Sequence, residues 1–265
     1  NIDGMISEYL DVLEISNGYI QSVQNTLNRV IGFSEESKYN TVLQEQLMSR
    51  IQKNPSSDIY TQMLIWVLMQ QNKYEAAMIQ VKALDKRNKE DGQRVISLAK
   101  TALNNYKYDV AIDGYNYMKS KGSSNYYYVE SSIALLDAMK LKVVNSAYSE
   151  TSIDQLILAY QKALDEFGKT ASTSQLIVDF AHVKAFYQSR YNNNSVVEAI
   201  NLLQNGLKIP GLDERQTALL KMELADIYVL TGLIWDASLL YGQVEKRFKY
   251  DEIGFEAKLK NAKVF

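Results

Sequence analysis

The sequence contains no cysteine in its 265 residues. This absence excludes disulfide bonds, thiol nucleophiles and zinc sites built on thiolates, and it is compatible with a reducing or an oxidising compartment. His182 is the only histidine, and Asp179 stands one helical turn before it. Since a catalytic or metal site needs several convergent groups, this pair supplies at most half of one. We therefore predict no metal site.

Glycine is sparse, with twelve residues that never cluster. No G-x-G-x-x-G or G-x-x-x-x-G-K-[ST] segment is present, so a loop that cradles phosphate is not predicted. No G-x-S-x-G segment marks a serine nucleophile. The sequence therefore predicts no catalytic residue and no cofactor, and it favours a protein that is not an enzyme.

The sequence also lacks a charge surplus, long apolar runs and proline. Lys and Arg number 29 against 31 Asp and Glu, for a net charge of −2, so there is no basic surplus for a nucleic-acid partner. The longest strongly apolar run covers residues 63–69, against the ~20 residues needed to span a bilayer, so no transmembrane segment is predicted. With only two prolines, turn-rich all-β folds are disfavoured.

What the sequence does contain is helical periodicity. Apolar residues recur at i, i+3, i+4 and i+7 along almost every segment, and strict alternation is nearly absent. Helix-breaking residues separate these segments at short intervals. The pattern predicts about fourteen short helices joined by tight turns.

One spacing repeats along the chain: a large residue is followed at +3, +7 and +10 by small or apolar residues. The five sets begin at Tyr74, Tyr108, Ile153, Val196 and Ile234. The first two sets are 34 residues apart, and the later offsets are 45, 43 and 38 residues. A small residue at +3 allows close approach of a partner helix, while +7 and +10 fill the groove toward the next hairpin. Because one hairpin cannot bury that face alone, we predict a stacked array.

Two segments, 72–84 and 224–246, resemble tetratricopeptide repeats, and the 34-residue offset matches the unit of that family. The matching residues of the later segment are Leu224, Ala225, Tyr228, Gly232 and Ala237. The resemblance implies an all-α, right-handed superhelix, an α-solenoid of stacked antiparallel helix hairpins. It also implies protein binding rather than catalysis.

A narrower likeness concerns the segments 65–87 and 236–263, which resemble a group of long bacterial tetratricopeptide proteins. In that group another repeat follows, so the resemblance implies that Phe265 is an internal point of a longer chain. It also points to the periplasm or cell envelope, although no signal in this sequence fixes the location.

We expect one tetratricopeptide-like solenoid over residues 1–265. Its parts are a degenerate repeat region at 1–55, two regular repeats at 56–120, two longer repeats at 121–210, a regular repeat at 211–249 and an orphan helix at 250–265. This last helix carries Phe255 and Leu259 as well as Ile253. Such a helix is expected to continue into a further repeat or to pair with a second copy, as in a homodimer through exposed terminal helices.

The candidate binding surface follows from the ninth position of each repeat, which in this family tends to face the concave groove. The candidate partner-binding residues are Gln62, Trp66, Met69, Gln70, Lys100, Asn104 and Asp226. Their mixed chemistry favours a peptide or helix of a partner protein. The competing interpretation is that Trp66 packs against the preceding hairpin. The family's clamp for a terminal carboxylate is not predicted, because Gln62, Trp66 and Ser97 occupy its places.

The 19 tyrosines allow two interpretations. They fill the large positions of the stacked hairpins, which we favour, or they form an aromatic binding surface. Tyr126, Tyr127 and Tyr128 are expected on one helix, and Trp235 in the core or a turn. The functional hypothesis is a non-catalytic protein–protein interaction scaffold. The alternative is a structural spacer or self-assembly arm of a larger cell-envelope protein.

Overall fold

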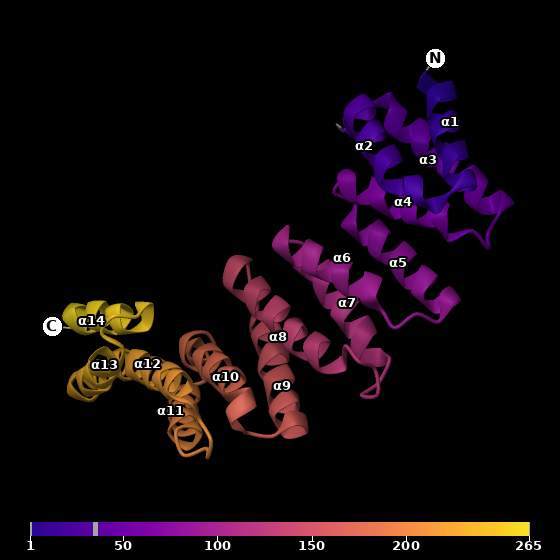
Figure 1. Ribbon diagram of the computed structural model, residues 1–265. Coiled ribbons are helices and arrows are strands. Elements are labelled where there is room, and N and C mark those ends of the chain that lie inside the picture. The colour runs from indigo at the N-terminus through magenta and orange to yellow at the C-terminus, as the bar shows by residue number, and fades with distance from the viewer. Residues whose placement is uncertain (1, 34–36, 265) are drawn as a thin grey trace. The chain divides into compact units, whose positions relative to one another are not determined.

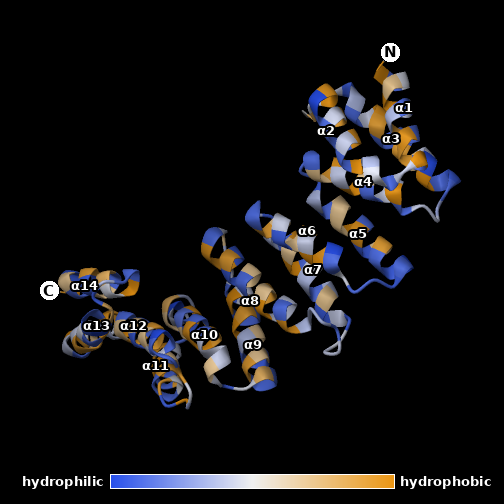
Figure 2. Ribbon diagram, in the orientation of Figure 1, coloured by the Kyte–Doolittle hydropathy of each residue, from blue (hydrophilic) through white to orange (hydrophobic). Residues whose placement is uncertain are grey.

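The computed structural model describes residues 2–33 and 37–264, and the expectation about Phe265 lies outside these residues. Over the described residues the chain forms fourteen α-helices and three short 3₁₀ helices, and no strand. The prediction of an all-α protein with about fourteen helices is confirmed. Hydrophobic and hydrophilic residues are interspersed along the helices (Figure 2).

The chain forms two compact units, Asn1–Ala138 and Met139–Phe265. In Figure 1 the first unit runs from indigo to magenta, and the second reaches yellow. The helices of the first unit are α1 (Ile2–Ile15), α2 (Ile20–Ile31), α3 (Lys38–Lys53), α4 (Asp58–Gln70), α5 (Tyr74–Asn88), α6 (Gln93–Asn104), α7 (Tyr108–Ser120) and the first part of α8 (Tyr128–Asn145). Those of the second are the rest of α8, α9 (Glu150–Phe167), α10 (Ser174–Phe186), α11 (Ser195–Gly206), α12 (Glu214–Leu230), α13 (Ile234–Phe248) and α14 (Glu252–Val264). The 3₁₀ helices are Asn17–Tyr19, Ala171–Thr173 and Gln188–Arg190.

Three hairpins close with the same turn. In α4–α5, α6–α7 and α12–α13 a residue with positive φ stands between the helices: Asn72 at 55°, Tyr106 at 59° and Gly232 at 77°. In each turn the next backbone N–H donates to the carbonyl five residues earlier, at 2.8 to 2.9 Å. This bond satisfies a carbonyl that the end of the first helix leaves free. The repetition of one turn geometry in both units is the local basis of the repeat.

The residues of the repeated spacing predicted from the sequence lie in the core. The residues at +3, which are Ala77, Ala111, Leu156, Ala199 and Ala237, are all fully buried. Those at +7 and +10 are buried as well. Close packing extends to Gly114, where a Cβ would lie 2.6 Å from the Met78 methyl carbon and 2.9 Å from the Ala99 Cβ. The small residues are therefore required for the approach of neighbouring helices.

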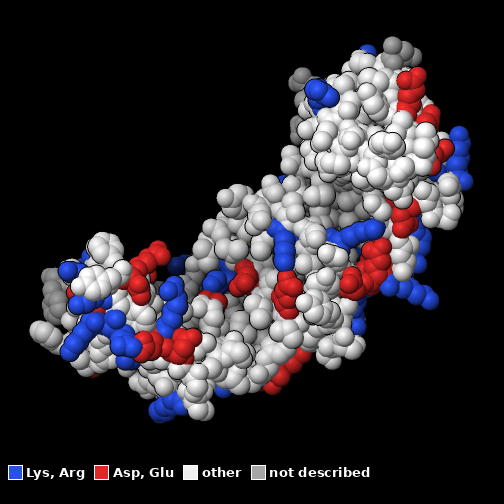
Figure 3. Space-filling view, in the orientation of Figure 1, with Lys and Arg blue, Asp and Glu red and all other residues white. Residues whose placement is uncertain are grey.

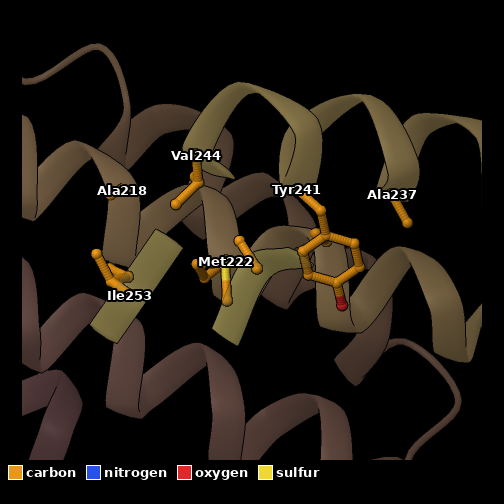
Figure 4. Close-up of a cluster of buried hydrophobic side chains, with 8 residues drawn as sticks. Ala218, Met222, Ala237, Tyr241, Val244 and Ile253 are labelled. Carbon is orange, nitrogen blue, oxygen red and sulfur yellow. The ribbon is translucent and has the colours of Figure 1, made fainter. Parts of the chain in front are cut away.

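The core of the second unit contains a cluster built from α12, α13 and α14 (Figure 4). Tyr241 and Val244 point from α13 toward Met222 of α12 and Ile253 of α14. This cluster attaches the last helix to the preceding hairpin. None of the helices within 2–33 and 37–264 combines the length and apolar character that a membrane span requires.

Packing, the favoured interpretation, applies to part of the tyrosines, of which six are buried. Four of them, Tyr60, Tyr115, Tyr160 and Tyr241, are among the largest fully buried side chains. Two expectations were wrong. The run at 126–128 does not lie on one helix, because Tyr126 and Tyr127 form the turn before α8. Trp235 is 78% exposed, because Ala237, two residues later, faces the core and places Trp235 on the opposite side of α13.

Candidate functional site

An open groove of the first unit is lined by residues of α4, α5 and α6 and has a volume of about 400 Å³. The residues that line it are Gln62, Ile65, Met69, Val81, Gln93, Arg94, Ser97, Leu98 and Thr101. α4 and α6 are the first helices of consecutive hairpins, so the groove follows from the way the hairpins stack. It is an open channel at the surface rather than an enclosed cavity.

The floor of the groove is apolar. Ile65, Val81 and Leu98 come from three different helices, and each is buried in the core with one side turned to the groove. Met69 is half-buried above them. Its unbranched thioether chain adapts to differently shaped side chains. The floor therefore presents an apolar surface in an open groove.

The rim of the groove is polar. The Ser97 hydroxyl donates to the Gln93 carbonyl at 2.9 Å, and the Thr101 hydroxyl donates to the Ser97 carbonyl at the same distance. Both hydroxyls have thus used their only proton and keep lone pairs as acceptors. The amide groups of Gln62 and Gln93 offer both a donor and an acceptor. The rim therefore presents both hydrogen-bond donors and acceptors.

The structure brings two of the seven sequence-predicted residues, Gln62 and Met69, into this groove. Trp66 lies on the same helix but is half-buried and meets the Phe33 ring edge-on, with ring centroids 5.1 Å apart and planes at 89°. Gln70 is exposed at the end of α4 and outside the lining. The ring contact follows the competing interpretation, in which Trp66 packs against the preceding hairpin.

The remaining predicted residues lie elsewhere. Lys100 forms an ion pair with Glu130 of α8 at 2.5 Å, and Asn104 is exposed at the end of α6. Asp226 belongs to the second unit, where it accepts hydrogen bonds from the Tyr241 hydroxyl and, at 2.6 Å, from the Lys260 ammonium. It therefore joins α12 to both α13 and α14.

This cluster of charges shifts the titration of its members. Burial and the adjacent Asp226 carboxylate raise the pKa of Tyr241 well above its ordinary value. For Lys260, burial acts to lower the pKa, but the carboxylates of Asp226 and Glu256 outweigh it and raise the pKa. The proton-bearing forms of both side chains are stabilised in the folded protein.

The partner-binding residues predicted from the sequence did not include Gln93, Arg94, Ser97 or Thr101 of α6, which line the groove. Gln93, Ser97 and Thr101 recur every four residues and form one polar stripe, which was a readable signal. The residues predicted on this helix were instead Lys100 and Asn104. Neither residue lines the groove, because the side of α6 that borders it carries Gln93, Ser97 and Thr101.

The His182 side chain contacts a carboxylate and an aromatic ring of the protein. Its Nδ1 lies 2.9 Å from Glu223 Oε1, and its ring stacks on Phe186 with a centroid distance of 4.7 Å. Across residues 2–33 and 37–264, no group of three or more carboxylate or histidine side chains is placed to hold a metal ion.

Antiparallel hairpins stacked in register define an α-solenoid, and comparison with known proteins specifies its type. No protein-family model matches the sequence, and no curated protein is significantly similar to it. Among solved structures, a thermophilic tetratricopeptide-repeat protein of Thermus thermophilus is similar at 16% identity and a TM-score of 0.50, over 78% of this chain and 98% of that chain. A tetratricopeptide-repeat protein of Parabacteroides merdae matches at 12% identity and a TM-score of 0.30, over 95% of this chain and 97% of that chain. The chain has the tetratricopeptide-repeat fold.

Proposed function

We propose that this protein is a non-catalytic protein–protein interaction scaffold that binds a peptide segment or helix of its partner in the groove between α4 and α6. The observation that carries the proposal is the groove itself, with its apolar floor and polar rim. An apolar floor supplies affinity by removing a side chain from water, and a polar rim fixes the direction of the bound chain.

The surface charge is consistent with such a specific contact. Figure 3 shows basic and acidic side chains interspersed over the visible face, without a large field of one sign. Several are paired across neighbouring helices, as in Lys82 with Asp113 at 2.6 Å. Binding is therefore expected to depend on the groove rather than on long-range attraction.

The test replaces Met69 by Gln, a side chain of similar length that makes the floor polar. The matched control is Ile79→Gln, which alters an exposed apolar residue of α5 outside the groove lining. Peptides are first selected on the native protein from a displayed random pool, and their affinities are then measured for all three proteins. We expect the Met69 variant to bind about tenfold more weakly and the control to bind as the native protein does.

Equal affinities for both variants would contradict binding in this groove. Circular dichroism and thermal unfolding of the three proteins verify that the substitutions leave the fold intact. Since Met69 is half-buried and Ile79 exposed, neither change removes a core residue.

A second candidate function is a structural spacer or self-assembly arm of a larger cell-envelope protein. The observation that favours it is a group of exposed apolar side chains on α13 and α14, which includes Trp235, Leu239, Phe255 and Leu259. Light scattering over a range of concentrations tests it. Self-association that Phe255→Glu abolishes would support assembly through α14, and a monomer at all concentrations would contradict it.

A further inference from the structure

We propose that the α4–α6 groove selects partner segments in which an acidic side chain lies beside an apolar one, with the carboxylate bound by Arg94. This inference rests on the proposed function and specifies the chemistry of the partner. The apolar side chain would occupy the floor formed by Ile65, Met69 and Leu98.

Arg94 is the charged residue of the groove. Of the nine residues that line the groove, eight are uncharged. Its side chain is 40% exposed, so the guanidinium is accessible to a ligand. The nearest cation on the same helix, Lys100, is neutralised by Glu130. Arg94 itself forms an ion pair with Glu90, which at 3.5 Å is longer than the 2.5 Å pair of Lys100 with Glu130, and Glu90 is not among the lining residues.

The guanidinium of Arg94 has hydrogen-bonding capacity to spare. Its Nη1 is buried and, within the part of the chain that the structure describes, makes no hydrogen bond, so a ligand would bind through the other N–H groups of the guanidinium. Glu90 Oε1 is 3.5 Å away, beyond the ordinary range of such a bond, and it already accepts from the Asn88 amide at 3.2 Å. A guanidinium has five N–H donors and binds a carboxylate through two parallel hydrogen bonds. A carboxylate from a partner would satisfy donor capacity that the protein itself leaves open.

The other polar groups of the groove do not compete for this role. The Ser97 and Thr101 hydroxyl protons are directed to carbonyls of α6, so they cannot donate to an anion. The amides of Gln62 and Gln93 are uncharged and suit the peptide backbone. Since Arg94 is the one charged residue of the lining, it would bind one carboxylate, which points to a single acidic side chain within the partner segment.

The experiment uses the whole chain and three synthetic peptide pools with acetylated N-termini and amidated C-termini. Each pool fixes a central leucine and carries Glu, Gln or Lys at one nearby position, with the remaining positions randomised. Because both termini are blocked, a terminal carboxylate cannot contribute. Affinities are measured by fluorescence anisotropy for the native protein, Arg94→Gln, Arg94→Lys and Met69→Gln.

We expect the native protein to bind the Glu pool about tenfold more tightly than the Gln pool, and the Lys pool most weakly. Arg94→Gln should abolish this preference, and Arg94→Lys should restore part of it because an ammonium lacks the planar fork. Met69→Gln should weaken all pools by a similar factor. The advantage of Glu should shrink as salt is added.

The outcomes separate the two proposals. If the native protein binds the Glu and Gln pools equally while Met69→Gln weakens both, the acidic preference is wrong and the groove still binds peptides. If Arg94→Gln retains the preference for Glu, another cation is responsible and the inference is also wrong. If no pool binds the native protein, the proposed function fails, and the inference fails with it.

Discussion

The ninth position of the repeat is filled very differently in the two units. In the first unit it is Trp66 on α4, which turns toward Phe33 and leaves the side of α4 that faces α6 open. It is also Lys100 on α6, which pairs with Glu130 of α8. In the second unit it is Asp226, which binds Lys260 of the following helix α14. The same register position thus contacts the preceding hairpin at Trp66 and a following helix at Lys100 and Asp226.

This difference indicates which neighbouring hairpins have an open groove between their first helices. Where a hydrogen-bonded charge pair joins two first helices, as in α12 and α14, the space between them is bridged by the protein's own side chains. Where the ninth residue packs backward, as in α4, the space remains available to a partner. The predictions below test this contrast, from the largest expected effect to the smallest.

The largest effect is expected at Gly254, where α14 passes close to the end of α13. A Cβ on this residue would lie 1.8 Å from the Phe248 carbonyl oxygen, so α14 would have to shift. Gly254→Ala should therefore destabilise the second unit by about 3 kcal/mol. Gly242→Ala is the control, because nothing lies within 4 Å of its added Cβ, and it should add about 0.5 kcal/mol through helix propensity. Urea unfolding followed by circular dichroism compares the two, and equal stabilities would contradict the close approach.

The charge pair between α12 and α14 is the next test. Asp226→Asn removes the carboxylate that accepts from both Tyr241 and Lys260, and the unfolding free energy should fall by about 1 kcal/mol after allowance for solvent exposure. The control is Asp236→Asn, which changes an exposed residue and leaves the cluster intact. A double-mutant cycle with Lys260→Met measures the coupling. Additive effects of the two substitutions would contradict a direct pair.

Alkaline pH should separate the buried tyrosines of both units from the exposed ones. Burial raises the pKa of Tyr115 to about 12, and the pKa of Tyr241 is raised as well, from an ordinary value of 10.0. Because the folded-state pKa lies above the unfolded one, this contribution to stability is complete below pH 10 and is lost as the pH rises through the folded value. Unfolding free energies measured from about pH 9 to about pH 11.5 should fall, with a shallower slope in Tyr241→Phe. The same slope in the native protein and this variant would contradict the assignment, and exposed Tyr250→Phe is the control.

The smallest effect concerns the shared hairpin turn. Tyr106 has a φ of 59° and Gly232 a φ of 77° in equivalent turns, but only glycine adopts this region without strain. Gly232→Ala should cost about 1 kcal/mol, whereas Tyr106→Gly should change the unfolding free energy by less than about 0.5 kcal/mol, because relief of strain offsets the greater entropy of the unfolded chain. Thermal unfolding compares them, and a strong loss on Tyr106→Gly would show that the tyrosine side chain stabilises the turn.

Much of the fold could be predicted from the sequence because the stacking of hairpins depends on local spacing. The small residues at +3 and the large ones at +7 mark the core without knowledge of distant contacts. The groove could be predicted only in part. Gln62 and Met69 followed from the register, but the direction of Trp66 depends on Phe33, and the partner of Asp226 is Lys260, 34 residues away. Periodicity does not reveal such pairings, nor which side of α6 faces α4.

Methionine-methyl NMR tests the central claim that the α4–α6 groove binds a partner segment. The chain has eight methionines, of which Met69 lines the groove, while Met222 is buried in the core of the second unit. A peptide selected on the native protein is titrated into the ¹³C-methyl-labelled chain. The account predicts that the Met69 resonance shifts in step with binding while Met222 does not move. A saturable shift of other methionines with Met69 unchanged would place binding elsewhere and contradict the account.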